Sequence, residues 1–322
     1  MIAKPKKISV VIVTWNNEKT IQLCIDSLLR QTGVDLEIQI FDNASSDKTI
    51  SIINNFPNIH LVVSQQNQGF CIPNNLGIKQ ANGEYILLIN PDARLTDGYL
   101  ETLIQKTESN KDVAAITGKI LRMSSDGTPE LINGLPIIDT VGIKLKRNRR
   151  AIDIGRGEID RGQYEQERWV FGISAAICLY RKEALLHATI GEQIFDETYF
   201  VYFEDVDLSW RLGLLGWRCL YTPETIAFHA RGWRESFDNR RRVPEFIRYH
   251  SFKNKRLTIL KNEHLNTFLP DLLHVVGLET LAFGYILLKE RFLLSAYREI
   301  LMAVPHIRHW RNAIHSRMDY SN

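Results

Sequence analysis

Hydrophobic and polar positions follow two alternating periods over the first 120 residues. Short runs of aliphatic and β-branched residues, typical of buried strands, occupy residues 8–13, 36–41, 59–63, 85–89 and 113–117. Between them, apolar residues recur every three or four positions, which predicts helices over residues 20–29, 47–56, 73–80 and 97–106. This alternation predicts an α/β fold with a mainly parallel central sheet and helices on both faces.

The remainder of the chain changes character three times. Residues 119–168 are rich in Gly, Asp and Arg and predict a loop-rich insertion, with a basic cluster at Lys144, Lys146, Arg147, Arg149 and Arg150. Apolar order returns over residues 173–229, and residues 265–304 are apolar and predicted to be helical. We therefore expect a main domain over residues 1–235, with halves 1–120 and 121–235, and a C-terminal helical extension over residues 236–322.

Composition and charge exclude several classes of protein. The chain has 322 residues, of which 44% are hydrophobic and 24% charged, as in folded globular proteins rather than disordered, collagen-like or polytopic membrane proteins. A net charge of +3 is too balanced for a nucleic-acid partner. The four cysteines form no Cys-x-x-Cys pair, and the first apolar run is too short for a signal peptide, so we expect reduced thiols in the cytoplasm.

Each of the first four predicted strands is followed by a loop of small polar residues. In order, the loops contain Thr14-Trp15-Asn16-Asn17, Asp42-Asn43-Ala44-Ser45-Ser46-Asp47, Asn67-Gln68-Gly69-Phe70 followed by Asn75-Leu76-Gly77, and Asn90-Pro91-Asp92. Any one of them could be an ordinary turn or helix cap. Ligands of parallel α/β sheets collect at the carboxyl ends of the strands, so four such loops together predict a ligand site.

A second polar group lies in an aromatic setting near residue 200. The chain reads Phe195-Asp196-Glu197 and then Tyr202-Phe203-Glu204-Asp205-Val206-Asp207. Aromatic neighbours exclude water, which raises the pKa of a carboxyl group and makes its carboxylate a better base. The alternative is structural, because acids favour a helix N-terminus and Asp207 is spaced for an ion pair with Arg211. We expect that structural role for Asp207 and a chemical role for Asp205.

The motifs and their order along the chain resemble those of glycosyltransferase family 2. The resemblance is strongest to the bacterial rhamnosyltransferases that assemble cell-surface polysaccharides. The resemblance covers residues 8 to about 230 and implies a GT-A (nucleotide-diphospho-sugar transferase) fold. The matching residues are Val11-Ile12-Val13-Thr14-Trp15-Asn16, the loops at residues 42–47, 67–70, 75–77 and 90–92, Phe195-Asp196-Glu197, Glu204-Asp205-Val206-Asp207 and His229.

The resemblance assigns the strand-end loops to a dTDP- or UDP-sugar donor. Asp42 would accept a hydrogen bond from the base N3–H, which selects uracil or thymine over cytosine. The residues expected at the donor are Thr14, Trp15, Asn16, Asp42, Asn43, Ser45, Asn67, Gly69, Asn75 and Asn90.

A divalent metal, Mg²⁺ or Mn²⁺, is also implied by the resemblance. Asp92 corresponds to the last residue of the family's Asp-x-Asp motif, which holds the metal on the diphosphate. Here the first acid of that motif is replaced by Asn90, so a single carboxylate remains. His229 resembles the family's second metal ligand, and a structural histidine is the alternative.

The expected reaction is sugar transfer with inversion. Asp205 would remove the proton of the acceptor hydroxyl, with Glu204 as the alternative base. One base and no enzyme nucleophile imply a single displacement. The first-choice donor is dTDP-rhamnose and the acceptor a glycan or lipid-linked hydroxyl, whereas a UDP-linked galactofuranose, glucose or N-acetyl sugar is the alternative.

Two other functional classes stay open. A nucleotidyltransferase acting on sugar phosphates has a similar sheet, but it usually carries a glycine-rich loop after the first strand, and residues 14–17 contain no glycine. A non-catalytic protein that binds nucleotide-sugars or glycans would fit the imperfect Asp-x-Asp motif, but the retained Asp205 argues against it.

The C-terminal third is expected to dock on the inner face of the cell membrane. Segment 240–262 has eight Lys or Arg residues and the single acid Glu245, a net charge of +7. Residues 272–288 carry no charge except Glu279, but 17 residues are short of the ~20 that span a bilayer. Solvated and dimer-forming helices are the alternative, so an oligomer stays open. The cations expected to attract anionic lipid are Arg240, Arg241, Arg242, Lys253, Lys255 and Arg256.

Overall fold

The computed structural model describes residues 5–231 and 243–318. Its first half alternates strands and helices as the hydrophobic pattern predicts. The strands are β1 (Lys6–Thr14), β2 (Val34–Asp42), β3 (His60–Val63) and β4 (Tyr85–Ile89), and the helices between and after them are α1 (Ile21–Leu29), α2 (Thr49–Ile53), α3 (Cys71–Gln80) and α4 (Tyr99–Ser109). The fifth expected strand is β6 (Val113–Arg122). All five strands and four helices expected in the first 120 residues are therefore confirmed.

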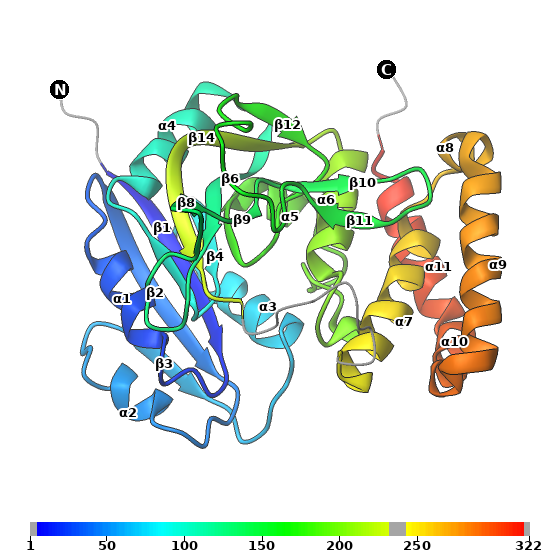
Figure 1. Ribbon diagram of the computed structural model, residues 1–322, viewed down its shortest axis with the longest axis horizontal. Coiled ribbons are helices and arrows are strands. Elements are labelled where there is room, and N and C mark those ends of the chain that lie inside the picture. Colours follow the sequence, from blue (N-terminus) through cyan, green and yellow to red (C-terminus); the bar gives the residue numbers. More distant parts are fainter. Residues whose placement is uncertain (1–4, 232–242, 319–322) are drawn as a thin grey trace.

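A ten-stranded sheet forms the centre of the molecule (Figure 1). Its main order is β12-β14-β6-β13-β4-β1-β2-β3, with β5 (Ala93–Leu95) beside β14 and β9 (Ile138–Thr140) beside β6. The pairs β1–β2, β1–β4, β2–β3 and β6–β14 are parallel, whereas β13 (Ile177–Arg181) runs antiparallel between β4 and β6. β12 (Arg168–Val170) and β14 (Arg218–His229) complete a mixed, mostly parallel sheet.

Helices cover both faces of the sheet because consecutive strand residues point to opposite sides. In β1, Val10 packs with residues of α1 and α4, whereas Val11 packs with residues of α3, α5 (Lys182–His187) and α6 (Glu204–Leu214). Strands buried on both faces read as continuous apolar runs, which is the pattern seen in the sequence. The four cysteines are buried and unpaired, as expected.

The region expected to be a loop-rich insertion contains more strand than predicted. β6 continues through residues 119–122 at the centre of the sheet, and the short strands β7 (Leu131–Ile132), β8 (Leu135–Pro136), β10 (Ile143–Leu145) and β11 (Ala151–Asp153) form two hairpins. Short strands between Gly and Asp residues leave too few periodic positions for a sequence pattern to reveal them.

The C-terminal helices stand together at one side of the sheet domain (Figure 1). They are α7 (Glu245–Asn262), α8 (Leu265–Phe268), α9 (Leu272–Lys289), α10 (Leu294–Met302) and α11 (Val304–His315). Leu257, Ile300 and Ile307 join the core that lies against α6, so this extension packs on the sheet domain. The segment Leu265–Lys289 is the one helical stretch of the described residues that is long and apolar enough to cross a membrane.

The basic residues of α7 do not form the free cationic surface expected from the sequence. Lys255 and Arg256 both form ion pairs with Glu279 of α9, and Lys253 lies 3.4 Å from Glu299 of α10. The expected lipid contacts Arg240, Arg241 and Arg242 lie outside the described residues. The described cations Lys253, Lys255 and Arg256 are instead paired with acids of α9 and α10.

Candidate active site

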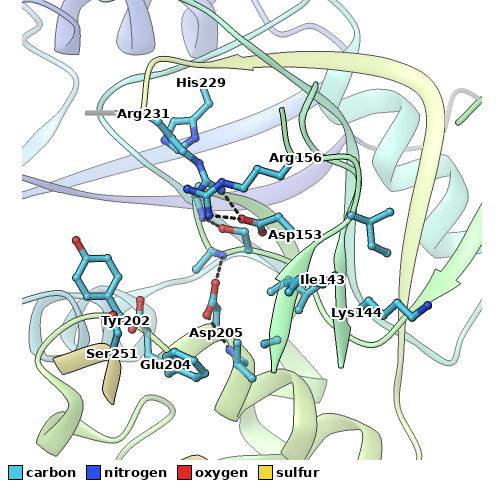
Figure 2. A pocket seen from close by; sticks show the side chains of 18 of the residues that line it. Ile143, Lys144, Asp153, Arg156, Tyr202, Glu204, Asp205, His229, Arg231 and Ser251 are labelled. Atoms are coloured by element: carbon cyan, nitrogen blue, oxygen red, sulfur yellow. Dashed lines mark hydrogen bonds and ion pairs between the residues drawn. The ribbon is translucent and has the colours of Figure 1, made fainter. Parts of the chain in front are cut away.

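A pocket of about 1090 Å³ opens beside the carboxyl end of β4. Five of the residues expected to carry chemistry line it, namely Asn90, Asp92, Glu204, Asp205 and His229. Asn90 and Asp92 lie more than 100 residues before the other three, and the sheet brings them together because β14 returns beside β6 and β5. In Figure 2, His229 lies on one side of the pocket, and Glu204 and Asp205 lie on the other.

The expected donor loops meet at one sheet edge, as parallel strands require. Thr14 is in register with Asp42, and Asp42 with Val63. Asp42 is fully buried, and its Oδ1 atom accepts a hydrogen bond of 2.8 Å from the backbone of Ser45. Its Oδ2 atom is buried with no hydrogen-bond partner among the described residues. A buried carboxylate oxygen without a donor is costly, so this atom is available to a ligand.

The loops after β1 and β2 hold each other in place. The backbone N–H of Asn16 donates to Ser45 Oγ at 2.8 Å, and Asn16 Oδ1 accepts from the backbone of Ser46 at 2.8 Å. Asn16 has a φ of 55°, which Asn tolerates better than most residues. Trp15 beside it is 54% exposed. These contacts leave the Trp15 side chain free to contact a ligand.

The loop after β3 is joined to both neighbouring segments. Asn43 Nδ2 donates to the carbonyl of Gly69 at 2.8 Å, and the Asn67 side chain accepts from the backbone N–H of Gly69 at 2.9 Å. Gly69 has a φ of 77°, and a Cβ there would lie 2.4 Å from the carbonyl oxygen of Phe200. Only glycine fits this position, so the donor loop lies directly against the loop that precedes Glu204 and Asp205.

Asn75, expected to face the donor, makes its hydrogen bonds inside the protein. Its Nδ2 atom donates to the Phe195 carbonyl at 2.8 Å, and its Oδ1 atom accepts from the backbone of Ile194 and Phe195. The side chain is 7% exposed. Asn75 therefore acts on the site by fixing the segment around Phe195.

Asp92 and His229, the two expected metal ligands, lie next to each other. His229 Nε2 lies 3.2 Å from Asp92 Oδ1 and 3.3 Å from Asn90 Nδ2. On the other side of the ring, His229 Nδ1 lies 2.9 Å from Asp139. Burial opposes the charged imidazolium, but the carboxylates of Asp92 and Asp139 outweigh it and raise the pKa of His229 to about 10.

The residues Asp139, Asp153 and Arg231 were not expected from the motifs. Arg231 lies 2.8 Å from both Asp139 and Asp153, and Arg231 and Asp153 line the pocket (Figure 2). Asp139 is an acid inside the apolar stretch 137–141, and it is fully buried. This acid in an otherwise mostly apolar segment was the sequence signal that could have revealed the cluster, because an acid in a buried strand needs a cationic or hydrogen-bonding partner.

Asp205 and Glu204 begin α6 and face different surroundings. Asp205 accepts hydrogen bonds from the backbone of Val206 at 2.8 Å and of Ala175 at 3.4 Å. Burial and the nearby charge of Asp153 raise its pKa to about 6. Burial and the charge of Asp205 raise the pKa of Glu204 well above its usual range, and Glu204 Oε2 is buried without a partner in the described chain. With a pKa of about 6, Asp205 is mostly ionised at neutral pH, whereas Glu204 ionises less readily than usual.

A strained loop leads into these two acids. Phe200, Tyr202 and Phe203 have φ values of 59°, 69° and 73°, which cost roughly 1–3 kcal/mol each for bulky residues. Asn254 of α7 is fully buried, and its Nδ2 atom lies 2.9 Å from each of the carbonyl oxygens of Tyr199, Val201 and Tyr202. The backbone N–H of Phe70 donates to the Phe200 carbonyl at 2.6 Å. The loop is thus held from two sides.

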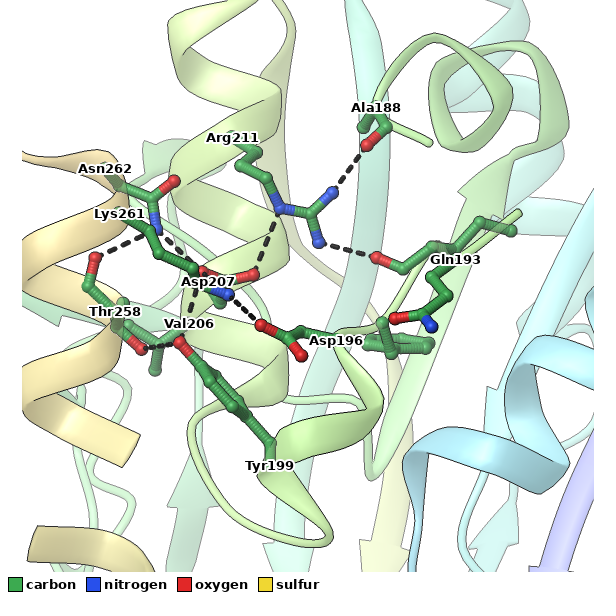
Figure 3. Close-up of polar contacts among 12 residues, drawn as sticks. Ala188, Gln193, Asp196, Tyr199, Val206, Asp207, Arg211, Thr258, Lys261 and Asn262 are labelled. Carbon is green, nitrogen blue, oxygen red and sulfur yellow. Dashed lines mark hydrogen bonds and ion pairs between the residues drawn. The ribbon is translucent and has the colours of Figure 1, made fainter. Parts of the chain in front are cut away.

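A buried ion network fixes α6 itself (Figure 3). Asp207 lies 3.1 Å from Arg211, which confirms the ion pair expected from their spacing. Lys261 of α7 lies 3.0 Å from Asp207 and 2.8 Å from Asp196, and all of these side chains are buried. His306 of α11 adds a second contact to Asp196 at 2.9 Å. The C-terminal helices therefore help to position the helix that carries Asp205.

Comparison with known proteins places this site in a class. The model of the family described as Glycosyl transferase family 2 matches residues 9–187. The N-acetylglucosaminyl-diphospho-decaprenol L-rhamnosyltransferase of Mycobacterium tuberculosis is 27% identical over 240 residues, which are 68% of this chain and 75% of the relative. The poly-beta-1,6-N-acetyl-D-glucosamine synthase of Staphylococcus epidermidis is 26% identical over 224 residues, 69% of this chain and 49% of the relative.

Solved structures share the architecture. S. aureus TarS 1-349 in complex with UDP-GlcNAc aligns with a TM-score of 0.56 and 18% identity, over 97% of this chain and 87% of that chain. GalNAc-T7 with UDP, GalNAc and Mn²⁺ aligns with a TM-score of 0.59 and 13% identity, over 80% of this chain and 48% of that chain. At this identity the likeness concerns the fold alone.

The sheet order, the polar site at the strand ends and these neighbours define the GT-A fold, as expected from the sequence. Within that fold class, the chain belongs to glycosyltransferase family 2 and is a glycosyltransferase. The family, the fold class and the enzyme class expected from the motifs are therefore confirmed.

Proposed function

We propose that the chain transfers a sugar from a nucleoside-diphosphate sugar to a hydroxyl of a glycan or lipid-linked acceptor in polysaccharide synthesis, with inversion at the anomeric carbon. The carrying observation is that Asp205, ionised at neutral pH, shares one pocket with Asp92 and His229. A single displacement at sugar C1 needs a base for the acceptor and a site for the leaving diphosphate on the other side.

The donor end of the proposal rests on Asp42 and the loops around it. The partnerless Oδ2 atom of Asp42 can accept the N3–H of uracil or thymine, an interaction that cytosine, whose N3 is an acceptor, does not offer. Thr14, Trp15, Asn16, Asn43 and Ser45 would enclose the base and ribose, while Asn67 and Gly69 would shape the wall beside them. Asn75 would contribute through the segment it holds.

In the proposed reaction, Asp205 accepts the proton of the acceptor O–H while that oxygen attacks C1. The bond between C1 and the diphosphate oxygen breaks, and its electron pair leaves with the nucleoside diphosphate. No enzyme nucleophile takes part, so C1 inverts once. Asp205 is held for this step by backbone N–H groups of Val206 and Ala175, which orient its carboxylate without neutralising it.

Glu204 is a poorer candidate for the base. Burial and the charge of Asp205 raise its pKa well above the usual range, so its carboxylate forms less readily than that of Asp205. We therefore keep Asp205 as the base and assign Glu204 a supporting role at the pocket wall.

Asp92 and His229 are the residues that would hold a divalent cation. Within the described ranges, no group of three or more His, Cys, Asp or Glu side chains is arranged to bind a metal alone. Two protein ligands nevertheless suit an ion whose other ligands are substrate phosphates and water. Asp139 holds His229 Nδ1, which leaves Nε2 directed at Asp92, the arrangement common for metal-binding histidines. When bound, the ion neutralises charge on the leaving diphosphate. GalNAc-T7 and a mannosyltransferase with Mn²⁺ are structural neighbours that support this choice, with Mg²⁺ as the alternative.

The sugar and the acceptor follow from the relatives. The M. tuberculosis relative is named as a rhamnosyltransferase acting on a diphospho-decaprenol-linked sugar, which supports rhamnose from dTDP-rhamnose and a lipid-linked acceptor. The name of the S. epidermidis synthase and the UDP-GlcNAc complex of TarS favour a UDP-linked sugar as the second candidate.

A matched pair of variants tests the assignment of the base. Asp205→Asn should reduce sugar transfer by ~10²–10⁴-fold while leaving binding of the donor intact, because the base alone is removed. Glu204→Gln, which mimics the neutral acid, should retain most of the transfer activity. Initial rates are measured as nucleoside diphosphate released from dTDP-rhamnose and from UDP-sugars in the presence of lipid-linked acceptor. Normal turnover by Asp205→Asn, or equal loss in both variants, would reject the assignment.

A further inference from the structure

Helix α9 has an apolar outer surface that the described part of the chain leaves uncovered. Leu273, Leu281 and Leu288 are 85%, 74% and 77% exposed. Val275 and Ile286, on the opposite side, are buried against the protein. Further exposed apolar residues on α9 are Leu272, Val276, Phe283, Tyr285 and Leu287.

The single charged residue within this apolar run is turned inward. Glu279 lies 3.1 Å from Lys255 and also forms an ion pair with Arg256, both on α7. The acid that interrupts residues 272–288 in the sequence therefore does not interrupt the outer surface. The apolar face continues along the whole helix.

The width of the exposed face favours lipid over a second protein helix. At 100° per residue, the exposed apolar positions from Leu272 around to Tyr285 cover an arc of about 220°. A helix packed on one partner needs a stripe of only about 100°. A bilayer surrounds every side of a helix that the protein does not cover, so a wide arc suits lipid.

The charges of the C-terminal helices complement an anionic surface. The three acids of the described residues 272–318 are Glu279, Glu290 and Glu299, and each forms an ion pair with a cation of α7. The cations that lie within residues 272–318 are therefore left without a pairing acid from the same described stretch. Exposed cations that form no ion pair with an acid of the described residues include Lys289, Arg291, Arg298 and Arg308.

The same surface is attached to the catalytic pocket. Arg149, in the turn between β10 and β11, forms buried ion pairs with Glu263 and with Asp271, which directly precedes α9. Residues of β10 and β11 line the pocket that contains Asp205. A bilayer contacted by α9 would thus lie beside the wall of the pocket, where a lipid-linked acceptor could enter.

We propose that α9, together with Lys289, Arg291, Arg298 and Arg308, is a docking surface for an anionic lipid bilayer. Helix α9 lies in the plane of the membrane, with its inward side still packed on the protein. The α7 cations hold Glu279 and Glu290 on the inner side of the helices and partly neutralise the exposed Glu299. This proposal does not depend on the sugar transferred, and its link to a lipid-linked acceptor is the part that rests on the proposed function.

Vesicle co-sedimentation of the full chain tests the proposal without any substrate. Vesicles of phosphatidylcholine containing phosphatidylglycerol should bind the protein, and vesicles of phosphatidylcholine alone should bind it at least about tenfold less, because cations near an anionic surface each contribute to binding. Binding should weaken with salt. Leu273→Gln/Leu281→Gln/Leu288→Gln should reduce binding at least about tenfold. The matched control Leu29→Gln/Leu131→Gln/Leu186→Gln changes three other exposed leucines and should bind as the parent does.

Charge-removing variants separate electrostatic binding to anionic lipid from non-specific hydrophobic adsorption. Lys289→Gln/Arg291→Gln/Arg298→Gln should weaken binding to anionic vesicles by at least about tenfold, whereas Lys19→Gln/Lys48→Gln/Lys111→Gln should not. Light scattering of each variant reports the oligomeric state. Equal binding by the leucine variants, or a dimer that the α9 variant converts to a monomer without any vesicle binding, would overturn the proposal. Neither result would bear on Asp205, whose role is measured separately.

Discussion

At the scale of single residues, Asp205 links the structure to the pH dependence of the enzyme. Burial and Asp153 raise its pKa to about 6, and the base must be ionised to act. The rate should be constant above that pH and fall about tenfold per pH unit below it. This acid limb of the pH–rate profile is measured from rates between pH 4.5 and 8.5 at saturating substrate concentrations. A rate that stays constant down to pH 4.5 would contradict the assignment.

Asp153 offers a sharper form of that test. Its negative charge raises the pKa of Asp205, whereas Arg231 lowers it. Asp153→Asn removes the repulsion and leaves the field of Arg231 less compensated, so both effects lower the pKa of Asp205. The acid limb of the rate profile should move to lower pH, with Glu204→Gln as a control that keeps the limb near its original position. A limb that moves upward would show that another group titrates.

The proposed metal site can be tested with variants of Asp92, His229 and Asp139. Titration calorimetry with UDP or dTDP in Mn²⁺ should show at least about tenfold weaker binding for Asp92→Asn and for His229→Ala, because each removes a ligand. Asp139→Asn should weaken binding about 10–100-fold, because it removes the carboxylate that orients His229. In excess chelator the variants should differ little from the parent. Full transfer activity in chelator would rule out a metal-dependent reaction.

At the scale of elements, Asn254 connects a C-terminal helix with the loop before the catalytic acids. Asn254→Leu removes the donor shared by three carbonyls, so the positive-φ residues 200–203 lose a support that offsets their strain. Displacement of Asp205 by about 1 Å can cost ~10²-fold in rate. We expect kcat to fall by that order while the KM for the donor changes little. Asn254→Ser, which keeps one donor, should lie between, and Asn312→Leu, an exposed control, should have no effect.

At the scale of the whole molecule, Lys261 joins the C-terminal helices to the catalytic helix. Lys261→Met leaves Asp196 and Asp207 buried with less compensation, which typically costs about 3–5 kcal/mol of unfolding free energy. The loss is measured by urea unfolding of the full chain. Adding Asp196→Asn to Lys261→Met should recover part of it, since one uncompensated charge is removed. A Lys261→Met variant as stable as the parent would show that His306 and Arg211 alone compensate the buried charges of Asp196 and Asp207.

The sequence by itself determined the order and type of the elements in the first half of the chain. Short, nearly continuous apolar runs such as residues 8–13 are typical of strands buried on both faces, and each polar loop follows a strand whose parallel neighbour fixes its position. The ordered motifs also determined the family. The ion pair of Asp207 with Arg211 was predictable because it is local.

Only the tertiary structure decided which distant residues share a site. The antiparallel insertion of β13, the contact of His229 with Asp139 and the support of residues 199–202 by Asn254 join segments separated by 50 or more positions, and no local period encodes such pairings. The pairing of the C-terminal cations could likewise not be predicted from the local sequence. Their number could be read from the sequence, but their inward ion pairs depend on how α7, α9 and α10 pack, since an ion pair forms only where folding brings both charges within about 4 Å.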